Sequence, residues 1–178
     1  MKEAEEMLKS LEKRLSEVGL EIHPEKTRIV YCKKENRNGS HTHEKFDFLG
    51  YTFRSRLVKS KHGKFFTGFT PAISDQAKKG IRSIIREMKL QFRTSQELTD
   101  LSKALNPKIR GWMNYYGKFC LSELNSVLKY INKALLKWVM NKYKKLRKSK
   151  AKARKWLARI AKASPELFVH WKKGIIND

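Results

Sequence analysis

The chain has 178 residues, 40% apolar and 33% charged, which is enough for one core beneath a strongly ionic surface. Lys and Arg number 41 against 17 Asp and Glu, a formal net charge of +24. Such a charge destabilises a compact chain unless a polyanion offsets it, so nucleic acid is the expected partner, with an anionic membrane surface a distant second. No apolar run approaches the roughly 18 residues of a transmembrane helix, so we expect no membrane span.

The sequence also disfavours an exported or zinc-binding protein. The N-terminal run MKEAEEMLKSLEKRL mixes acids and bases, unlike a signal or transit peptide. Cys32 and Cys120 lie far apart without a CxxC motif, so we expect a cytoplasmic protein with no zinc site. His41 and His43 lie in a polar loop without cysteines, and solvated histidines are the better interpretation than metal ligands.

Residues 1–70 are predicted to form a helix and a small sheet. Apolar residues recur at helical spacing over 2–18, and Gly19 is a natural stop after them. The run 27–32, TRIVYC, is β-branched and apolar, which predicts a first strand.

A second strand is predicted over residues 46–53, FDFLGYTF, where bulky side chains alternate. Asn38-Gly39 is the turn signal in the polar loop that precedes it. Within this strand, Gly50 marks either a bulge or a place where another backbone approaches closely. Residues 56–58 and 64–69 flank a polar segment and predict a hairpin.

After Pro71 the patterns are helical only. Ser74 is the expected N-cap of a helix. Its apolar stripe is Ala77, Ile81, Ile84, Ile85, Met88 and Phe92. A capping box over 94–97 opens a second helix, which we expect to end at Asn106. Pro107 then suits the first position of a separate aromatic turn.

The longest predicted helix follows this turn. Its apolar seam steps by three and four through Leu121, Leu124, Leu128, Ile131, Leu135 and Trp138. Residues 144–155, KKLRKSKAKARK, are interpreted as loop, frayed helix or a segment ordered only on RNA. A last short helix lies around 156–160. The expected fold is α+β but mainly α: a small antiparallel sheet in domain 1–70, then a basic bundle of four or five helices in domain 71–178.

The positive charge is concentrated in the second half. Residues 1–70 carry a net charge of +5, residues 71–178 a net charge of +19, and between Glu123 and Glu166 stand 14 Lys and Arg without one acid. A solvated helix face normally alternates signs, so a one-sign run favours an anionic partner. The candidate RNA-binding residues are Lys108, Arg110, Lys118, Lys129, Lys133, Lys137, Lys142, Lys144, Lys145, Arg147, Lys148, Lys150, Arg154 and Lys155.

The stretch NPKIRGWMNYYG, residues 106–117, combines aromatics with cations. Unpaired RNA bases stack on aromatic rings, at about 1–3 kcal/mol per base, while Lys and Arg bind phosphates. The alternative is that Trp112, Tyr115 and Tyr116 share one helix face and fill the core. Lys108 and Arg110 are expected to face outward.

No catalytic constellation is present in the sequence. The aspartates Asp47, Asp75, Asp100 and Asp178 are isolated, and no two of them stand in a metal-ligand pattern. A Gly-rich phosphate loop and a nucleophile elbow are also missing. We therefore predict no catalytic or metal-ligating residue, and a binding protein rather than an enzyme.

Four motifs in order resemble the C-terminal part of group II intron reverse transcriptase/maturases: GLEIHPEKT, FDFLGYTF, NPKIRGWMNYY and FVHW, at residues 19–27, 46–53, 106–116 and 168–171. The resemblance runs from about residue 1 to about 173. The first two motifs are similar to the end of the polymerase palm. The helical half resembles the thumb, also called the maturase-specific domain or domain X.

The resemblance assigns expected roles to individual residues. The family signature Asn-Pro-x-x-Arg-Gly-Trp-x-x-Tyr is matched by Asn106, Pro107, Arg110, Gly111, Trp112 and Tyr115, with Tyr116 beside them. The family's Phe-Leu-Gly strand supports the primer end, so the primer-grip-like residues are Phe48, Leu49, Gly50 and Tyr51.

The departures from the family limit what the chain is expected to do alone. The Tyr-x-Asp-Asp motif and the upstream aspartate that hold the polymerase metals are missing, as is the DNA endonuclease module. The resemblance then implies either an excised or split fragment of a full reverse transcriptase or a degenerate open reading frame, which neither polymerises nor cuts DNA alone. It implies no cofactor in this chain, with Mg²⁺ only in the missing catalytic part or in the RNA.

The leading functional expectation is an RNA-binding maturase and thumb region that binds structured intron RNA and promotes splicing. One alternative is the half of a split RNA-directed DNA polymerase that grips primer and template, with a separate chain as its catalytic half. Another alternative is a basic bundle that binds nucleic acid without specificity.

Overall fold

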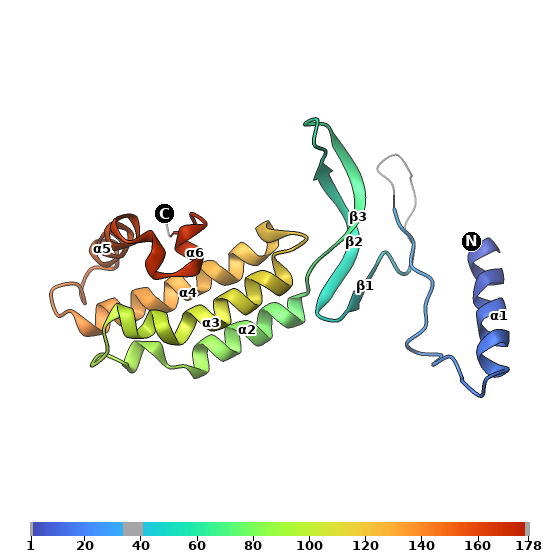
Figure 1. Cartoon of the computed structure of the whole chain (residues 1–178), viewed down its shortest axis with the longest axis horizontal. Coiled ribbons are helices and arrows are strands. Elements are labelled where there is room, and N and C mark those ends of the chain that lie inside the picture. The colour runs from blue at the N-terminus through green and yellow to red at the C-terminus, as the bar shows by residue number, and fades with distance from the viewer. Residues whose placement is uncertain (1, 34–40, 177–178) are drawn as a thin grey trace. The chain divides into compact units, whose positions relative to one another are not determined.

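The computed structural model describes residues 2–33 and 41–176, and the chain separates into two compact units (Figure 1). The sheet unit comprises Met1–Asp47 and Phe53–Thr70, and the helical unit comprises Phe48–Thr52 and Pro71–Asp178. As predicted, the fold is mainly helical, with a small antiparallel sheet before the helices. The Asn38-Gly39 turn lies outside the described residues. No described helix is long and apolar enough to cross a membrane.

Helix α1, Lys2–Ser16, confirms the helix predicted at the N-terminus, although it ends two residues earlier. Gly19 has a φ of +73°, and the Leu20 amide donates to the carbonyl of Leu15 at 3.0 Å, which closes the helix as a left-handed glycine cap does. No residue of α1 is buried. Its apolar stripe therefore contributes no core within the described residues.

The strand predicted over 27–32 is wrong. This segment is irregular and is held by isolated hydrogen bonds. The Tyr31 amide donates to the carbonyl of His43 at 2.8 Å, and the Ser55 hydroxyl donates to the carbonyl of Lys33 at 2.7 Å. β-Branched composition favours a strand only where a neighbouring strand offers a ladder, and these two bonds do not make one.

The single strand predicted over 46–53 is also wrong, because the chain reverses in its middle. Strands β1, Lys45–Phe48, and β2, Tyr51–Lys59, are joined by Leu49 and Gly50. These two residues have φ values of +48° and +78°, the conformation of a two-residue hairpin turn. Gly50 therefore occupies a turn and not a bulge.

The second hairpin is confirmed and longer than predicted. β3, Phe65–Ile73, pairs with β2, and the sheet order is β1-β2-β3. The ring of Phe46 in β1 contacts one aromatic from each of the other strands: it stacks on Phe53 at 4.8 Å and lies 6.1 Å from Phe69. These rings form a small apolar layer in the sheet unit.

Helix α2, Asp75–Glu87, begins at the predicted N-cap, where the Ser74 hydroxyl accepts a hydrogen bond from the Ala77 amide at 3.2 Å. Ile81 and Ile85 from its predicted stripe are buried, but Ile84 and Phe92 are exposed. Phe92 lies beyond α2, in the short 3-10 helix η1, Leu90–Phe92, so the helical period no longer applies to it.

The predicted break at Asn106 is wrong: α3 runs without interruption over Leu98–Tyr116 with Pro107 in its interior. Packing against the C-terminal segment accounts for this. The Asn106 side chain donates to the carbonyl of Leu167 at 3.0 Å and accepts from the amide of Val169 at 3.1 Å. The helix also starts later than the predicted capping box, with Glu97 as its N-cap.

Helix α4, Leu121–Lys142, is the centre of the helical unit and packs against α2, α3 and η1 (Figure 1). The predicted seam is confirmed from Leu124 to Trp138, whereas Leu121 at its start is 37% exposed. The indole of Trp138 donates to the carbonyl of Arg93 at 2.9 Å, so even this buried donor is satisfied.

The basic stretch 144–155 divides into a turn and a helix. Helix α5, Lys150–Ala163, begins at Ser149, whose hydroxyl accepts from the Lys152 amide at 3.3 Å. Two short elements complete the chain, η2 at Pro165–Leu167 and α6 at Val169–Lys172. Up to residue 176, where the described chain ends, the helical unit contains five α-helices, in agreement with the predicted bundle of four or five.

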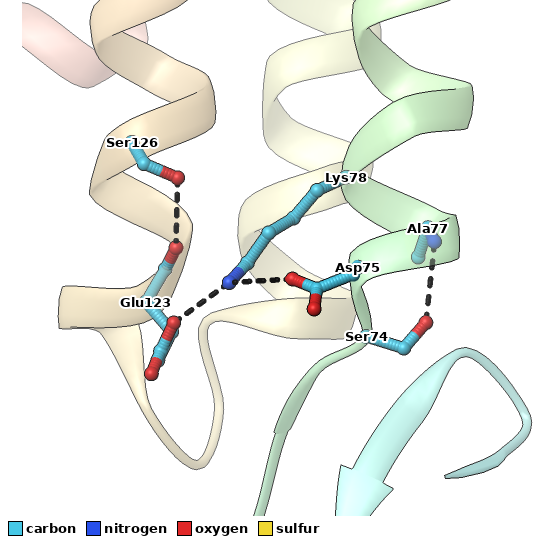
Figure 2. Close-up of polar contacts among 6 residues, drawn as sticks. All are labelled: Ser74, Asp75, Ala77, Lys78, Glu123 and Ser126. Atoms are coloured by element: carbon cyan, nitrogen blue, oxygen red, sulfur yellow. Dashed lines mark hydrogen bonds and ion pairs between the residues drawn. The ribbon is translucent and has the colours of Figure 1, made fainter.

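An ion pair fixes the start of α4 to the start of α2 (Figure 2). The ammonium group of Lys78 lies 2.7 Å from Glu123 Oε2 and 3.6 Å from Asp75 Oδ1, and its side chain is only 14% exposed. Because the ammonium group is sheltered from water, we expect this pair to stabilise the fold more than an exposed pair such as Arg14–Glu17.

Replacing Lys78 by Ala is expected to lower the free energy of unfolding by about 1–3 kcal/mol, because the carboxylate of Glu123 loses its ammonium partner. Tryptophan fluorescence during denaturant unfolding measures this, since all four tryptophans lie in the helical unit. The matched control is Lys79→Ala at the exposed neighbouring position, expected to change stability by no more than about 0.5 kcal/mol. Equal effects from both substitutions would show that the ion pair is not stabilising.

Candidate nucleic-acid interface

The predicted RNA-binding residues are exposed, with the exception of Lys142. Its side chain is 14% exposed, and its ammonium group lies 2.5 Å from Glu97 Oε1 and donates to the carbonyl of Gln96 at 2.6 Å. These contacts hold the end of α4 against the start of α3. We therefore leave Lys142 out of the candidate interface.

Five of the exposed cations surround a groove between α4 and α5. Its volume is about 410 Å³. The residues that line it are Lys129, Lys133, Leu136, Lys137, Met140, Lys150 and Arg154. This set, which the structure describes throughout, contains no acid. We call it the α4–α5 groove.

Helical spacing places three lysines of the groove together. Lys129, Lys133 and Lys137 follow one another at intervals of four, which keeps them on one face of α4. The intervening positions at Leu128, Ile131 and Leu135 are buried, so this face is the one directed away from the core.

Small buried residues bring α5 beside α4. Ala153 and Ala161 are fully buried and Leu157 nearly so, all on the side of α5 that joins the core. Lys150 and Arg154 are exposed on the same helix and enter the groove. The amphipathic pattern of α5 therefore places its cations opposite those of α4.

The charges of the groove are not neutralised by the protein. Within the described part of the chain, the side chains of Lys129, Lys133, Lys137, Lys150 and Arg154 take part in no hydrogen bond or ion pair. Like charges this close repel one another at a cost to the folded state. An anionic partner would relieve that repulsion.

The remaining predicted cations lie outside the groove lining. Lys144, Lys145, Arg147 and Lys148 are exposed in the connection between α4 and α5, and Lys155 is exposed on α5. Lys108 and Arg110 are exposed on α3, and Lys118 follows its end, so all three face outward. The groove and the adjoining connection together carry nine of the fourteen predicted cations.

Sequence reasoning missed the apolar floor of the groove. Leu136 is 4% exposed and Met140 is half-buried, and neither stood out among the predicted residues. Leu136 directly precedes Lys137 in the sequence, and Met140 follows Leu136 by four residues. A helical projection of α4 could have placed both next to the lysine face, but only the packing of α5 turns that face into a groove.

The aromatic motif divides between core and surface. Trp112 and Tyr116 are half-buried and pack against the core, whereas Tyr115 is 47% exposed. The Tyr115 hydroxyl donates to the carbonyl of Leu49 at 2.9 Å, and the Tyr51 hydroxyl donates to the carbonyl of Tyr115. Trp112 and Tyr116 thus agree with the core alternative, and stacking of this motif on RNA bases stays a prediction.

The primer-grip-like residues form the β1–β2 turn and belong to the helical unit. Phe48 and Leu49 are 60% and 68% exposed, while Tyr51 is buried. Gly50 has a positive φ, and a Cβ atom there would lie 2.9 Å from the hydroxyl oxygen of Tyr116. The closely approaching group is thus a tyrosine side chain of α3, where the sequence interpretation allowed for another backbone.

Burial raises the pKa of Tyr51 above its ordinary value of 10, and the neighbouring hydroxyls of Tyr115 and Tyr116 add to this. Burial, followed by Tyr115, also raises the pKa of Tyr116. An ordinary tyrosine is already neutral at physiological pH, and these shifts extend that neutral range further upward. The hydroxyl of Tyr51 is the hydrogen-bond donor that ties the turn to α3.

The FVHW motif is a buried polar network. Asn132 Oδ1 accepts from the indole of Trp171 and contacts His170 Nε2, both at 2.8 Å, and Asn132 Nδ2 donates to the carbonyl of Ile175 at 3.0 Å. Since Oδ1 is an acceptor, His170 carries its proton on Nε2. His170 Nδ1 is then a buried lone pair with no partner in the described structure.

Burial lowers the pKa of His170 from 6.5 to about 4. In the unfolded chain His170 therefore binds a proton near pH 6.5, whereas in the folded chain it binds one only near pH 4. The contribution of His170 to the free energy of unfolding is fully present above pH 6.5. It falls as the pH drops from 6.5 towards 4 and changes little below pH 4.

From pH 7 to pH 5 we expect the free energy of unfolding to fall by about 2 kcal/mol, at 1.36 kcal/mol per pH unit inside this window. Denaturant unfolding followed by tryptophan fluorescence measures it. The control His62→Gln, at an exposed histidine, should retain the decrease, and His170→Gln should abolish it. A decrease that persists in His170→Gln would assign the effect to other groups.

Within residues 2–33 and 41–176, no three His, Cys, Asp or Glu side chains gather in a way that could hold a metal ion. His41 and His43 are both exposed. The described residues instead offer a groove lined by cations and a cluster of tyrosine rings.

Part of the chain matches a known protein family. Residues 78–156 match the family described as "Group II intron, maturase-specific domain". The matched range runs from α2 to the middle of α5 and contains every residue that lines the α4–α5 groove. No curated protein and no solved structure matches the chain. The family match implies a role related to group II introns and their splicing. Residues 78–156 of this chain are therefore a group II intron maturase-specific domain.

Proposed function

We propose that this chain binds structured group II intron RNA through the α4–α5 groove and the adjoining connection, and that binding stabilises the RNA fold that splices. The observation that carries the proposal is the group of five exposed cations, without a protein partner, inside the matched domain. Phosphate groups are the ligands that such a surface fits.

In this mechanism the RNA supplies the catalytic chemistry and the protein supplies charge and shape. Folding brings phosphate groups of an intron close together, and their repulsion opposes the compact state. Lysines placed between two such backbones lower that repulsion and release condensed counterions. We propose that the Mg²⁺ ions of the reaction are held by the RNA.

A filter-binding titration across a salt series tests the proposal. It compares a folded group II intron RNA with a length-matched unfolded RNA and with a DNA duplex. We expect binding to the intron RNA to persist near physiological salt, while the other two weaken by about 10³–10⁵ over a fourfold rise in salt. Equal affinities and equal slopes for all three would replace the proposal by nonspecific phosphate binding.

A second candidate function is the primer-template grip of a split polymerase whose catalytic half is a separate chain. The exposed side chains of Phe48 and Leu49 favour it, since the hydroxyl of Tyr115 holds their turn in place. Co-expression with a chain that carries the missing aspartates distinguishes the two functions. Restored primer extension that is lost in Phe48→Ala would support the polymerase, and absence of extension would reject it.

A further inference from the structure

We propose that the α4–α5 groove receives an unpaired nucleotide of the RNA, with the base on the floor of Leu136 and Met140 and its flanking phosphates on the surrounding lysines. This inference rests on the proposed function, because it specifies which form of RNA the same groove selects. The contacts that carry it are the apolar floor and the guanidinium group of Arg154.

The floor distinguishes this groove from a simple phosphate-binding surface. Phosphates gain nothing from apolar side chains, yet Leu136 and Met140 line the groove between the cations. The volume of about 410 Å³ lies within the range of about 300–1,000 Å³ that small-molecule sites occupy. An apolar floor fits the flat face of a nucleotide base, and a rim of cations fits its phosphate. The groove therefore has the two features that a nucleotide requires.

Paired RNA would leave the floor unused. In a duplex the bases are stacked inside the helix, and proteins contact mostly phosphates and 2′-hydroxyls along the shallow groove. In loops and bulges the bases are available, and proteins hold them on aromatic rings, on guanidinium planes or against apolar side chains. The composition of the groove therefore favours an unpaired nucleotide over a duplex.

Arg154 adds the planar group that such a site needs. It reaches the groove from α5, opposite the lysines of α4, and no protein group within the described residues engages its side chain. A guanidinium group stacks on a base as well as binding phosphate, whereas the ammonium group of a lysine can only do the latter.

The test is a charge-preserving substitution. Arg154→Lys keeps the charge of the groove and removes the guanidinium plane. The matched control is Arg159→Lys, at an exposed arginine of the same helix outside the groove lining. The probes are an RNA hairpin with unpaired nucleotides in one strand and a fully paired hairpin with the same number of phosphates, titrated at physiological salt.

We expect the native chain and Arg159→Lys to prefer the bulged hairpin, and Arg154→Lys to lower that preference about fivefold or more. Met140→Lys serves as a second variant, because it raises the charge while removing apolar floor. A purely electrostatic groove predicts tighter binding by Met140→Lys, and a nucleotide site predicts weaker binding to the bulged hairpin. Phe92→Lys, which adds the same charge at an exposed residue outside the groove lining, is its control.

Failure of this inference differs from failure of the proposed function. If both hairpins bind equally and Arg154→Lys has no effect, the unpaired-nucleotide site is rejected while RNA binding stands. If neither hairpin nor the folded intron RNA binds near physiological salt, the proposed function itself is rejected.

Discussion

Simultaneous replacement of Lys129, Lys133, Lys137 and Arg154 by Glu is expected to weaken binding of folded group II intron RNA about 100-fold or more at physiological salt. Each phosphate contact contributes about 0.7–0.9 to the slope of log affinity against log salt. Loss of four contacts should therefore lower the magnitude of this slope by about three. Because these side chains are exposed and no described residue forms a hydrogen bond or ion pair with them, the fold should tolerate their reversal.

The control separates position from total charge. Lys9, Lys13, Lys61 and Lys64 are exposed lysines of the sheet unit, and their reversal to Glu changes the net charge by the same amount. We expect this second variant to lose no more than about tenfold in affinity, with a slope that changes by less than one. If both variants lose affinity equally, RNA affinity depends on the net charge of the chain and not on the position of the cations in the groove.

Replacement of Asn132 by Ala is expected to lower the free energy of unfolding by about 3–5 kcal/mol, the largest effect that we predict for a single substitution. Asn132 is 1% exposed and makes three hydrogen bonds to the C-terminal segment. Its loss leaves the indole N–H of Trp171, the carbonyl of Ile175 and the Nε2 proton of His170 buried without partners.

Asn114→Ala is the control for this prediction, because Asn114 is an exposed asparagine in the last turn of α3. It is expected to change stability by no more than about 0.5 kcal/mol. Denaturant unfolding followed by tryptophan fluorescence reports both variants. A loss below about 1 kcal/mol in Asn132→Ala would mean that the network is satisfied by other means, such as water.

The helices were predictable where local signals and the apolar period agree. Ser74 caps α2 as its sequence indicates, and the seam from Leu124 to Trp138 is buried as its three-four spacing predicts. Such signals act within a few residues, so no tertiary contact is needed to see them. The direction of Lys108 and Arg110 towards solvent follows from the same helical period.

Long-range contacts decided where prediction failed. Pro107 is a helix-breaking signal, yet Asn106 is bound by Leu167 and Val169, more than 60 residues away, and α3 continues through the proline. The turn at Leu49-Gly50 was hidden because leucine rarely adopts a positive φ, and the hydrogen bond from Tyr115 helps to hold it there.

The candidate site was predictable as charge and not as shape. The run without acids between Glu123 and Glu166 identifies the basic segment. Whether two lysine faces meet depends on how α5 packs on α4 through Ala153 and Ala161, which composition does not reveal. Lys142 looks like its neighbours in the sequence, and only the fold shows that Glu97 engages it.

Ultraviolet cross-linking of the native chain to folded group II intron RNA, followed by mass-spectrometric mapping of the adducts, tests the central claim most directly. The account predicts adducts concentrated on α4, α5 and their connection, between Glu123 and Glu166, and their loss in the four-residue reversal variant. Adducts confined to other segments, with α4 and α5 unmodified, would contradict the assignment of the RNA interface to the α4–α5 groove.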